Sequence, residues 1–104
     1  MKKLIIASAV AALGFTAGVQ AQDAAKLAQE KACLSCHQVA TKVVGPSFKD
    51  IAAKYRSDKG AEAKLTKKVR EGGVGAWGQI PMPPNPAVSE KDAQILVKWV
   101  LSQK

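Results

Sequence analysis

Both cysteines of the chain and its only histidine lie in one short stretch, CLSCH at positions 33–37. Two residues separate Cys33 from Cys36, and His37 follows directly. This spacing is typical of the attachment of a c-type haem. The two thiols would add to the two vinyl groups on one edge of the porphyrin, and the imidazole would bind the iron. The motif therefore predicts one covalent haem c, with Cys33 and Cys36 as its thioethers and His37 as a metal ligand.

Two other uses of this motif have to be weighed. Structural zinc takes four ligands, and the sequence has no further cysteine or histidine to supply them. A Cys-x-x-Cys pair can also be a dithiol redox centre, although that motif usually lies in a strand–helix–strand pattern, which is not found here. Zinc is thus nearly excluded, while the dithiol centre stays open.

A second iron ligand is expected in the proline-rich segment 75–86. Its last six residues, 81–86, include four prolines, which fix φ and remove backbone donors. The segment should therefore be stiff, and neither a helix nor a central strand. Met82 is the one methionine that remains when Met1 is removed. A methionine often only fills a core, but iron held by His and Met is an electron-transfer pattern, so we predict Met82 as the second ligand.

Other residues are candidates for orienting the two ligands. A histidine on iron normally donates its second ring N–H to an oxygen, and a carbonyl of the loop 43–46 could accept it, although Gly45 and Pro46 could equally be only a turn. The amide of Asn85 could donate to the sulfur of Met82. Trp77 could donate its indole N–H to a haem propionate or pack against the porphyrin.

The first 21 residues resemble an export signal. A short positive start precedes an apolar stretch from Leu4 to Val19, and small residues precede a cleavage position after Ala21. A membrane anchor is the alternative, but the apolar stretch is short for a span and contains glycines. We therefore expect 1–21 to be removed and residues 22–104 to form the mature domain, without stable membrane insertion.

The mature chain is long enough for one small domain, and a domain of this size usually needs a covalent or metal staple. The buried haem would serve as that staple. The 16 basic residues of the chain exceed its 8 acidic ones. Without the two lysines of the leader, and with two haem propionates, the mature protein has a net charge of about +4. Nucleic-acid binding is not expected, because the sequence has no recognition motif and is exported.

The mature sequence has helical spacing of apolar residues and no convincing period of two, so it predicts an all-α fold of about four short helices around the haem. Asp23, Ser47 and Ser89 are the expected N-caps. The helices should follow Asp23, run from Ser47 to Tyr55, run from 61 to 71 before Gly72, and follow Ser89. Inward-facing positions should be Leu27, Ala28, Ala32, Phe48, Ile51, Ala52, Tyr55, Leu65, Val69, Leu96, Trp99 and Val100.

Further expectations concern the surfaces of these helices. Trp99 should pack against the first helix. The basic residues of the third helix should be largely exposed, and their positive face is either ordinary solvated surface or a docking face. These basic residues are Lys64, Lys67, Lys68 and Arg70.

From end to end, the mature chain resembles the small bacterial class I monohaem cytochromes c of the c-551/c-552 type. The similarity rests on residues 33–37, 44–46, 77–85 and 98–101. Two positions depart from the family pattern. Ala32 stands where the family often has glycine, and Pro86 resembles an insertion of one residue after Asn85.

The resemblance implies a role for each residue that matches the family motifs. It implies His37 and Met82 as iron ligands, Cys33 and Cys36 as thioethers, Pro46 as the carbonyl to the histidine, Asn85 as the sulfur contact and Trp77 as the propionate contact.

The resemblance also implies a soluble periplasmic electron carrier, monomeric and not an enzyme. It implies a quinol-oxidising complex and a terminal reductase or oxidase as the partners, and the positive net charge predicts that their surfaces are acidic. The alternative is a haem peroxidase or gas-binding sensor in which Met82 is labile. No distal histidine or arginine is placed by a motif to assist such chemistry, which disfavours that alternative.

Overall fold

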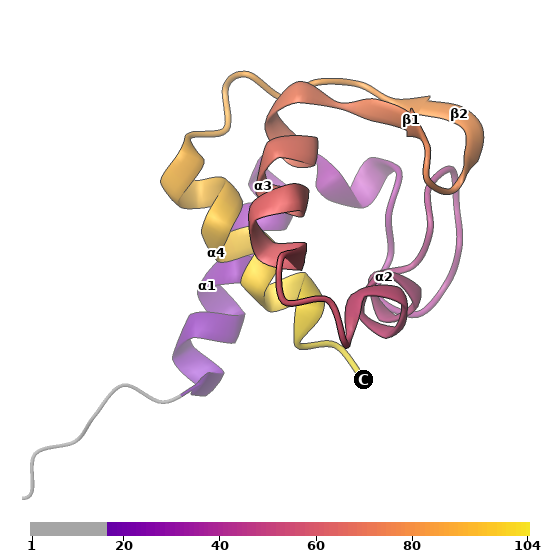
Figure 1. Cartoon of the computed structure of the whole chain (residues 1–104). Helices are drawn as coiled ribbons and strands as arrows, with labels where there is room; N and C mark the ends of the chain where they lie inside the picture. The colour runs from indigo at the N-terminus through magenta and orange to yellow at the C-terminus, as the bar shows by residue number, and fades with distance from the viewer. Residues whose placement is uncertain (1–16) are drawn as a thin grey trace, which may run out of the picture.

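The structure, a computed structural model, describes residues 17–104 (Figure 1). This part of the chain forms helices around a small crevice, with one two-stranded antiparallel sheet at its edge. The all-α prediction is confirmed for the helices, and the small sheet is an addition to it. In chain order the elements are α1 (Ala17–Glu30), a 3₁₀ helix (Cys33–Ser35), α2 (Phe48–Tyr55), α3 (Ala61–Glu71), β1 (Gly73–Gly75), β2 (Gly78–Met82) and α4 (Glu90–Leu101).

Serine side chains define the starts of α2 and α4. The hydroxyl of Ser47 accepts a hydrogen bond from the backbone N–H of Asp50 at 3.1 Å. Ser89 accepts one from the N–H of Asp92, also at 3.1 Å. Each bond satisfies a backbone donor that has no partner within the helix. Both predicted N-caps are thereby confirmed.

Gly72 ends α3 with a positive φ of 75°, and its N–H donates to Lys68 O at 2.7 Å. With a ψ of −171°, this conformation cannot continue a helix, and glycine is the residue that adopts it readily. Any Cβ on Gly72 would also overlap the carbonyl oxygen of Met82. The glycine therefore both stops α3 and allows the methionine-bearing segment to pass close to the helix end.

The predicted start of the first helix was wrong. The helix α1 is already formed at Ala17, the first residue that the structure describes, and continues past Asp23, so Asp23 lies inside the helix and is not its N-cap. In the intact chain, the residues before the predicted cleavage position are part of the same helix. Residues 1–16 of the expected leader lie outside the described part of the chain, and its removal stays a prediction.

Ala32 lies just beyond the end of α1 and lines the crevice, in agreement with its predicted inward-facing position, although its surface is largely exposed. Its φ of 63° is the one positive value at a non-glycine residue between 17 and 104. The chain turns out of α1 at this residue. A left-handed conformation costs an L-residue about 1–2 kcal/mol. This cost explains why glycine is a natural residue at such a position.

The core lies where α4 packs against the other three helices. In Figure 1, α4 crosses α1 behind α3. Trp99 and Phe48 of α2 form an edge-to-face pair with ring centroids 5.3 Å apart, and Trp99 also packs on a cluster that includes Ala28 of α1. Trp99 therefore packs on the core as predicted, and its aromatic partner comes from α2, while a direct contact with the first helix stays a prediction. The buried residues of the cluster are Ala28, Val88, Ala93 and Leu96.

The sequence did not predict the hairpin of β1 and β2. Gly73 pairs with Met82 and Gly75 with Gly78, with an irregular register between the two pairs. Pro81 fits inside β2 because both strands of a two-stranded sheet are edges, where a missing N–H is tolerated. Most of the hairpin is exposed on both faces, so burial imposes no alternation that the sequence could show.

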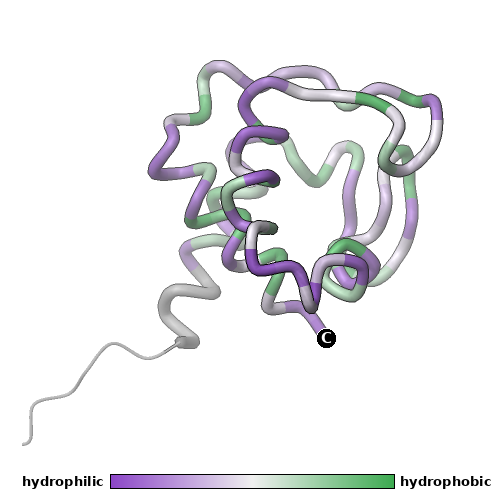
Figure 2. The backbone as a smooth tube through the Cα atoms, viewed as in Figure 1, coloured by the Kyte–Doolittle hydropathy of each residue, from purple (hydrophilic) through white to green (hydrophobic). Residues whose placement is uncertain are grey.

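Hydropathy follows this architecture. In Figure 2, α3 and α4 change between hydrophilic and hydrophobic within each turn, as expected for helices that cover a core on one side. Hydrophobic stretches also lie on the hairpin and on the neighbouring loop. Within residues 17–104, none of the helices has both the length and the apolar content needed to cross a bilayer.

Candidate haem site

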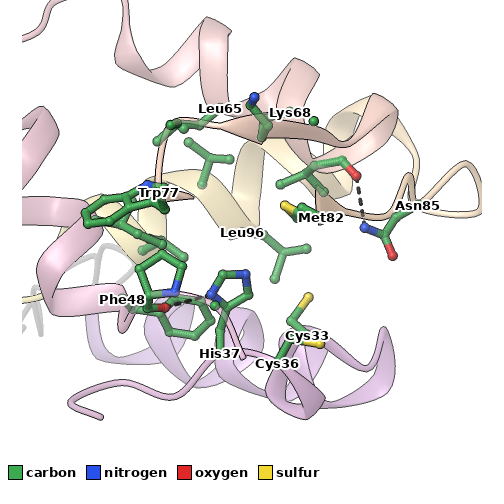
Figure 3. A pocket seen from close by; sticks show the side chains of 18 of the residues that line it. Cys33, Cys36, His37, Phe48, Leu65, Lys68, Trp77, Met82, Asn85 and Leu96 are labelled. Carbon is green, nitrogen blue, oxygen red and sulfur yellow. Dashed lines mark hydrogen bonds between the residues drawn. The ribbon is translucent and has the colours of Figure 1, made fainter. Parts of the chain in front are cut away.

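All the residues predicted for the site line one crevice (Figure 3). All four α-helices and the hairpin contribute to its walls. The lining is mostly apolar, and the sulfur and imidazole groups of the predicted site stand out within it. The predicted residues that line the crevice are Cys33, Cys36, His37, Pro46, Trp77, Met82 and Asn85.

The short 3₁₀ helix presents the two thiols and the imidazole together. The N–H groups of Cys36 and His37 both donate to Cys33 O, at 3.2 and 3.0 Å. This tight turn brings the three side chains to the same wall of the crevice (Figure 3). Both thiols are free. They are thus available for attachment to one edge of a porphyrin, with the histidine beside them.

The imidazole of His37 is held by contacts on two sides. Its Nδ1 lies 2.7 Å from Pro46 O, the acceptor that the resemblance implied. When Nδ1 carries the hydrogen and donates it to this carbonyl, Nε2 keeps its lone pair for a metal. Phe48 stacks on the imidazole with centroids 5.4 Å apart. A Cβ on Gly45 would lie 2.6 Å from His37 Cε1, so only glycine lets the loop pass this close to the ring.

The loop after His37 is more ordered than its sequence predicted. It is held by backbone hydrogen bonds, which the sequence cannot show because they depend on the path of the chain and not on side-chain type. Figure 1 shows this loop rising beside the hairpin before it enters α2. The bonds are Gly45 N to Cys36 O at 2.7 Å, Phe48 N to Gln38 O at 2.9 Å and Lys49 N to Val39 O at 3.0 Å.

Met82 lies across the crevice from His37, at the end of β2, with its side chain directed inward (Figure 3). Asn85 ties this segment to the end of α3. Its backbone N–H donates to Val69 O and Arg70 O, each at 3.2 Å. Its side-chain amide donates to Val69 O at 3.0 Å and to Pro83 O at 3.3 Å.

The two hydrogens of the Asn85 amide are thus directed at backbone carbonyls. The predicted contact between this amide and the sulfur of Met82 stays a prediction, and it would have to replace or share one of these bonds. What the observed bonds do is satisfy carbonyls in the last turn of α3, which have no partner within the helix. Asn85 therefore fixes the segment that carries Met82.

The hairpin places Trp77 at the rim of the crevice, with 44% of its surface exposed. Its predicted contact with a propionate stays a prediction. The ammonium of Lys54 lies 4.6 Å from the centroid of the indole ring and donates to Ala76 O at 2.9 Å. This contact could not be predicted from the sequence, because the two segments are far apart along the chain.

Lys68 corrects another expectation. It is half-buried and lines the crevice, whereas the sequence predicted a largely exposed side chain. Figure 3 shows it beside Leu65 on the wall formed by α3. Leu65, Lys68 and Val69 have the i, i+3, i+4 spacing of one helix face, so the signal was present in the sequence. A cation on this wall suits a bound group that carries carboxylates.

The electrostatics of Cys33 bear on the dithiol alternative. Burial raises the pKa of the Cys33 thiol above its usual value. Reactive dithiol centres have the opposite property, because a lowered thiol pKa supplies the thiolate that attacks. The raised pKa of Cys33 thus argues against a dithiol redox centre.

The donor set of the crevice fits a haem. The walls are apolar, two thiols lie along one side, and an imidazole and a thioether face the interior from opposite walls (Figure 3). These are the ligand types found in His/Met-ligated cytochromes c.

Comparison with known proteins agrees with this geometry. Residues 21–104 match the family model described as Cytochrome c. Cytochrome c-551 of Pseudomonas aeruginosa is 53% identical over 87 residues, which cover 84% of this chain and 83% of the relative. Cytochrome c-551 of Stutzerimonas stutzeri is 47% identical over 107 residues, and both chains are covered completely.

Among solved structures, the crystal structure of wild-type Nitrosomonas europaea cytochrome c552 is similar, with a TM-score of 0.75 and 54% identity. The match covers 77% of this chain and 99% of that chain. The sequence and the fold thus lead to the same family. The chain belongs to the class I cytochromes c of the c-551/c-552 type, in which a covalently attached haem c transfers electrons.

Proposed function

We propose that the protein is a soluble, monomeric electron carrier of the periplasm, without enzymatic activity. It would pass single electrons from a quinol-oxidising complex to a terminal reductase or oxidase. The observation that carries this proposal is the placement of His37 and Met82 on opposite walls of a crevice that Cys33 and Cys36 also line. The expected export signal at 1–21 supports the periplasmic location.

The haem supplies a one-electron Fe(III)/Fe(II) couple. The chain determines how that couple behaves. Cys33 and Cys36 prevent loss of the group, and His37 offers Nε2 to the iron while Pro46 O keeps the ring in place. Met82 offers a thioether, which favours the reduced state and closes the position at which exogenous ligands would bind.

A spectrum of the oxidised protein tests this ligand set. We expect a weak far-red charge-transfer band from Fe(III) and the sulfur of Met82, together with a low-spin reduced spectrum. Replacing Met82→Ala should leave the haem attached, abolish the band and lower the reduction potential, since the preference of the thioether for Fe(II) is lost. Cyanide or carbon monoxide that binds no faster to the variant than to the unchanged protein would contradict ligation by Met82.

The surface near the crevice suggests how partners meet the protein. Several large apolar residues on the hairpin and on the loop before α2 have exposed surface, and most of them also line the crevice. A carrier that binds briefly to two partners needs only a small apolar patch. We propose that it makes the productive contact. The residues are Val43, Val44, Val74, Trp77 and Ile80.

Basic residues would steer the encounter with acidic partners. Charge acts mainly on the rate of encounter, and its reach shortens to about 8 Å at physiological ionic strength. The transfer rate to an acidic partner should therefore fall as ionic strength rises. A rate that stays constant or rises would leave the apolar patch as the only docking feature. The basic residues concerned are Lys42, Lys49, Lys54, Arg56, Lys59, Lys64, Lys67, Lys68 and Arg70.

A further inference from the structure

The turn of the hairpin is tied to the rest of the described chain by few hydrogen bonds. Ala76 and Trp77 form this turn, between Gly75 and Gly78, whose φ values are 105° and 111°. Glycine leaves the backbone on both sides of the turn with more conformational freedom than other residues would. The position of such a turn therefore depends on the individual contacts that its own atoms make.

Lys54, in the last turn of α2, makes two of these contacts. Its ammonium donates to Ala76 O at 2.9 Å and lies 4.6 Å from the centroid of the Trp77 ring. The same group thus serves as a hydrogen-bond donor and as the cation of a cation–π contact on consecutive residues. Among the hydrogen bonds found within residues 17–104, this is the one that joins residues 74–81 to a part of the chain outside the hairpin.

The two elements that Lys54 joins support opposite walls of the crevice. At its first turn, α2 places Phe48 against the imidazole of His37. The hairpin continues through β2 to Met82. The contact of Lys54 therefore connects the helix behind one predicted iron ligand with the strand that carries the other.

We propose that Lys54 is a positioning residue that clasps the hairpin to α2 and so keeps the thioether of Met82 on the iron. This proposal rests on the proposed function, because it requires Met82 to be a ligand. Lys54 itself does not touch the iron. It acts on how often the hairpin moves away from α2, and hence on how often Met82 leaves its position.

Loss of the clasp should make the iron more accessible to external ligands. An external ligand can bind only while Met82 is displaced, so its binding rate reports how often the hairpin opens. One hydrogen bond and one exposed cation–π contact together correspond to roughly a threefold to tenfold change in that opening. The reducible haem and its attachment should be unaffected.

The experiment compares cyanide binding to the oxidised holoprotein and to four variants. Lys54→Met and Lys54→Gln remove the ammonium but keep a long side chain. Lys54→Arg keeps a cation that can donate to Ala76 O and lie over Trp77. Lys49→Met is the matched control, because Lys49 is exposed on the same helix and its ammonium makes no hydrogen bond or ion pair within the described residues. Unfolding by guanidinium is measured on each variant.

We expect cyanide to bind about three to ten times faster to the two neutral Lys54 variants, while Lys54→Arg and Lys49→Met stay close to the unchanged protein. The proposal is overturned if Lys49→Met accelerates binding equally, because net charge would then be the cause. It is also overturned if the neutral variants bind at the original rate, if Lys54→Arg behaves as they do, or if a loss of global stability accounts for the whole change.

The far-red band of the unchanged oxidised protein separates this proposal from the one on which it rests. If that band is absent, Met82 is not a ligand and the proposed function fails. If the band is present and the variants do not differ, only the clasp fails. Hydrogen exchange of the amides in 74–82, compared between Lys54→Met and Lys49→Met, gives a second readout that does not depend on the iron.

Discussion

The loop that carries His37 and the hairpin that carries Met82 face each other across the crevice, but they are held in different ways. The loop follows two attachment cysteines, folds back through several backbone hydrogen bonds and rests on Phe48. The hairpin is largely exposed, and its fixed points are Asn85 at its base and Lys54 at its turn. One wall of the crevice is thus built into the helical core, and the other is tied to it at a few points.

This difference assigns different properties to the two walls. The wall of His37 should change little unless the whole domain unfolds. The wall of Met82 should respond to single substitutions and open locally, because few contacts oppose its opening. The predictions below test each wall separately, in order of the size of the expected effect.

The largest effect is expected where the haem is attached. Replacing Cys33→Ala and Cys36→Ala together should give mostly unfolded protein without haem after export. A domain of this size has a small core, and the crevice would lose the group that fills it. Far-ultraviolet circular dichroism and a haem stain measure the outcome. A stably folded, haem-free double variant would show that the helical core does not depend on the cofactor.

On the wall of Met82, Gly72→Ala should destabilise the protein by about 2–4 kcal/mol. The new methyl group would adopt an unfavourable φ and overlap Met82 O, a backbone atom that cannot move without moving the strand. Denaturant unfolding measures the loss, and a weakened far-red band should accompany it. Gly75→Ala is the control, because its φ is also positive but its Cβ would meet nothing within 4 Å. Equal losses of unfolding free energy in both variants would show that the close approach of Gly72 to Met82 O is not the cause.

On the wall of His37, Gly45→Ala should cost about 1–3 kcal/mol. The added methyl group would press on the imidazole, which the bond to Pro46 O keeps from moving away. Unlike Gly72→Ala, this change should disturb the imidazole signals in nuclear magnetic resonance spectra of the reduced protein more than those of the methionine. Gly60→Ala serves as the control, since its Cβ would be at an ordinary contact distance of 3.5 Å.

The smallest effect is a gain. Ala32→Gly should stabilise the protein by about 0.5 kcal/mol, because glycine avoids the cost of a left-handed φ and loses only part of that gain as conformational entropy. The change lies just before Cys33, on the firmly held wall, so the cyanide binding rate should not change. A lower denaturation midpoint would contradict the strain inferred at Ala32.

The sequence predicted the parts of this molecule that depend on local pattern. The thiols, the imidazole and Met82 could be found because their chemistry demands particular residues at particular spacings. Ser47 and Ser89 marked helix starts because an N-cap bond is formed within one turn. These features need no knowledge of the rest of the fold.

Other features depend on how distant segments meet, and the sequence did not reveal them. The hairpin lies on the surface, so no alternation of burial marks it. The contact of Lys54 with Trp77 joins residues that are close only in the folded chain. The start of α1 was misjudged because, in the intact chain, the residues before Asp23 are part of the same helix. Only Lys68 was missed despite a visible signal, the helical spacing that it shares with Leu65 and Val69.

The bonds from Asn85 to the end of α3 have a consequence for insertions and deletions. They join the two ends of the segment 70–85, so this segment is a loop that is closed by the hydrogen bonds of Asn85. The entropy of closing such a loop depends only on the residues within it. Pro86 lies outside this loop, so a residue gained or lost there changes the path of the chain to α4. It does not change the number of residues between Met82 and either end of the loop.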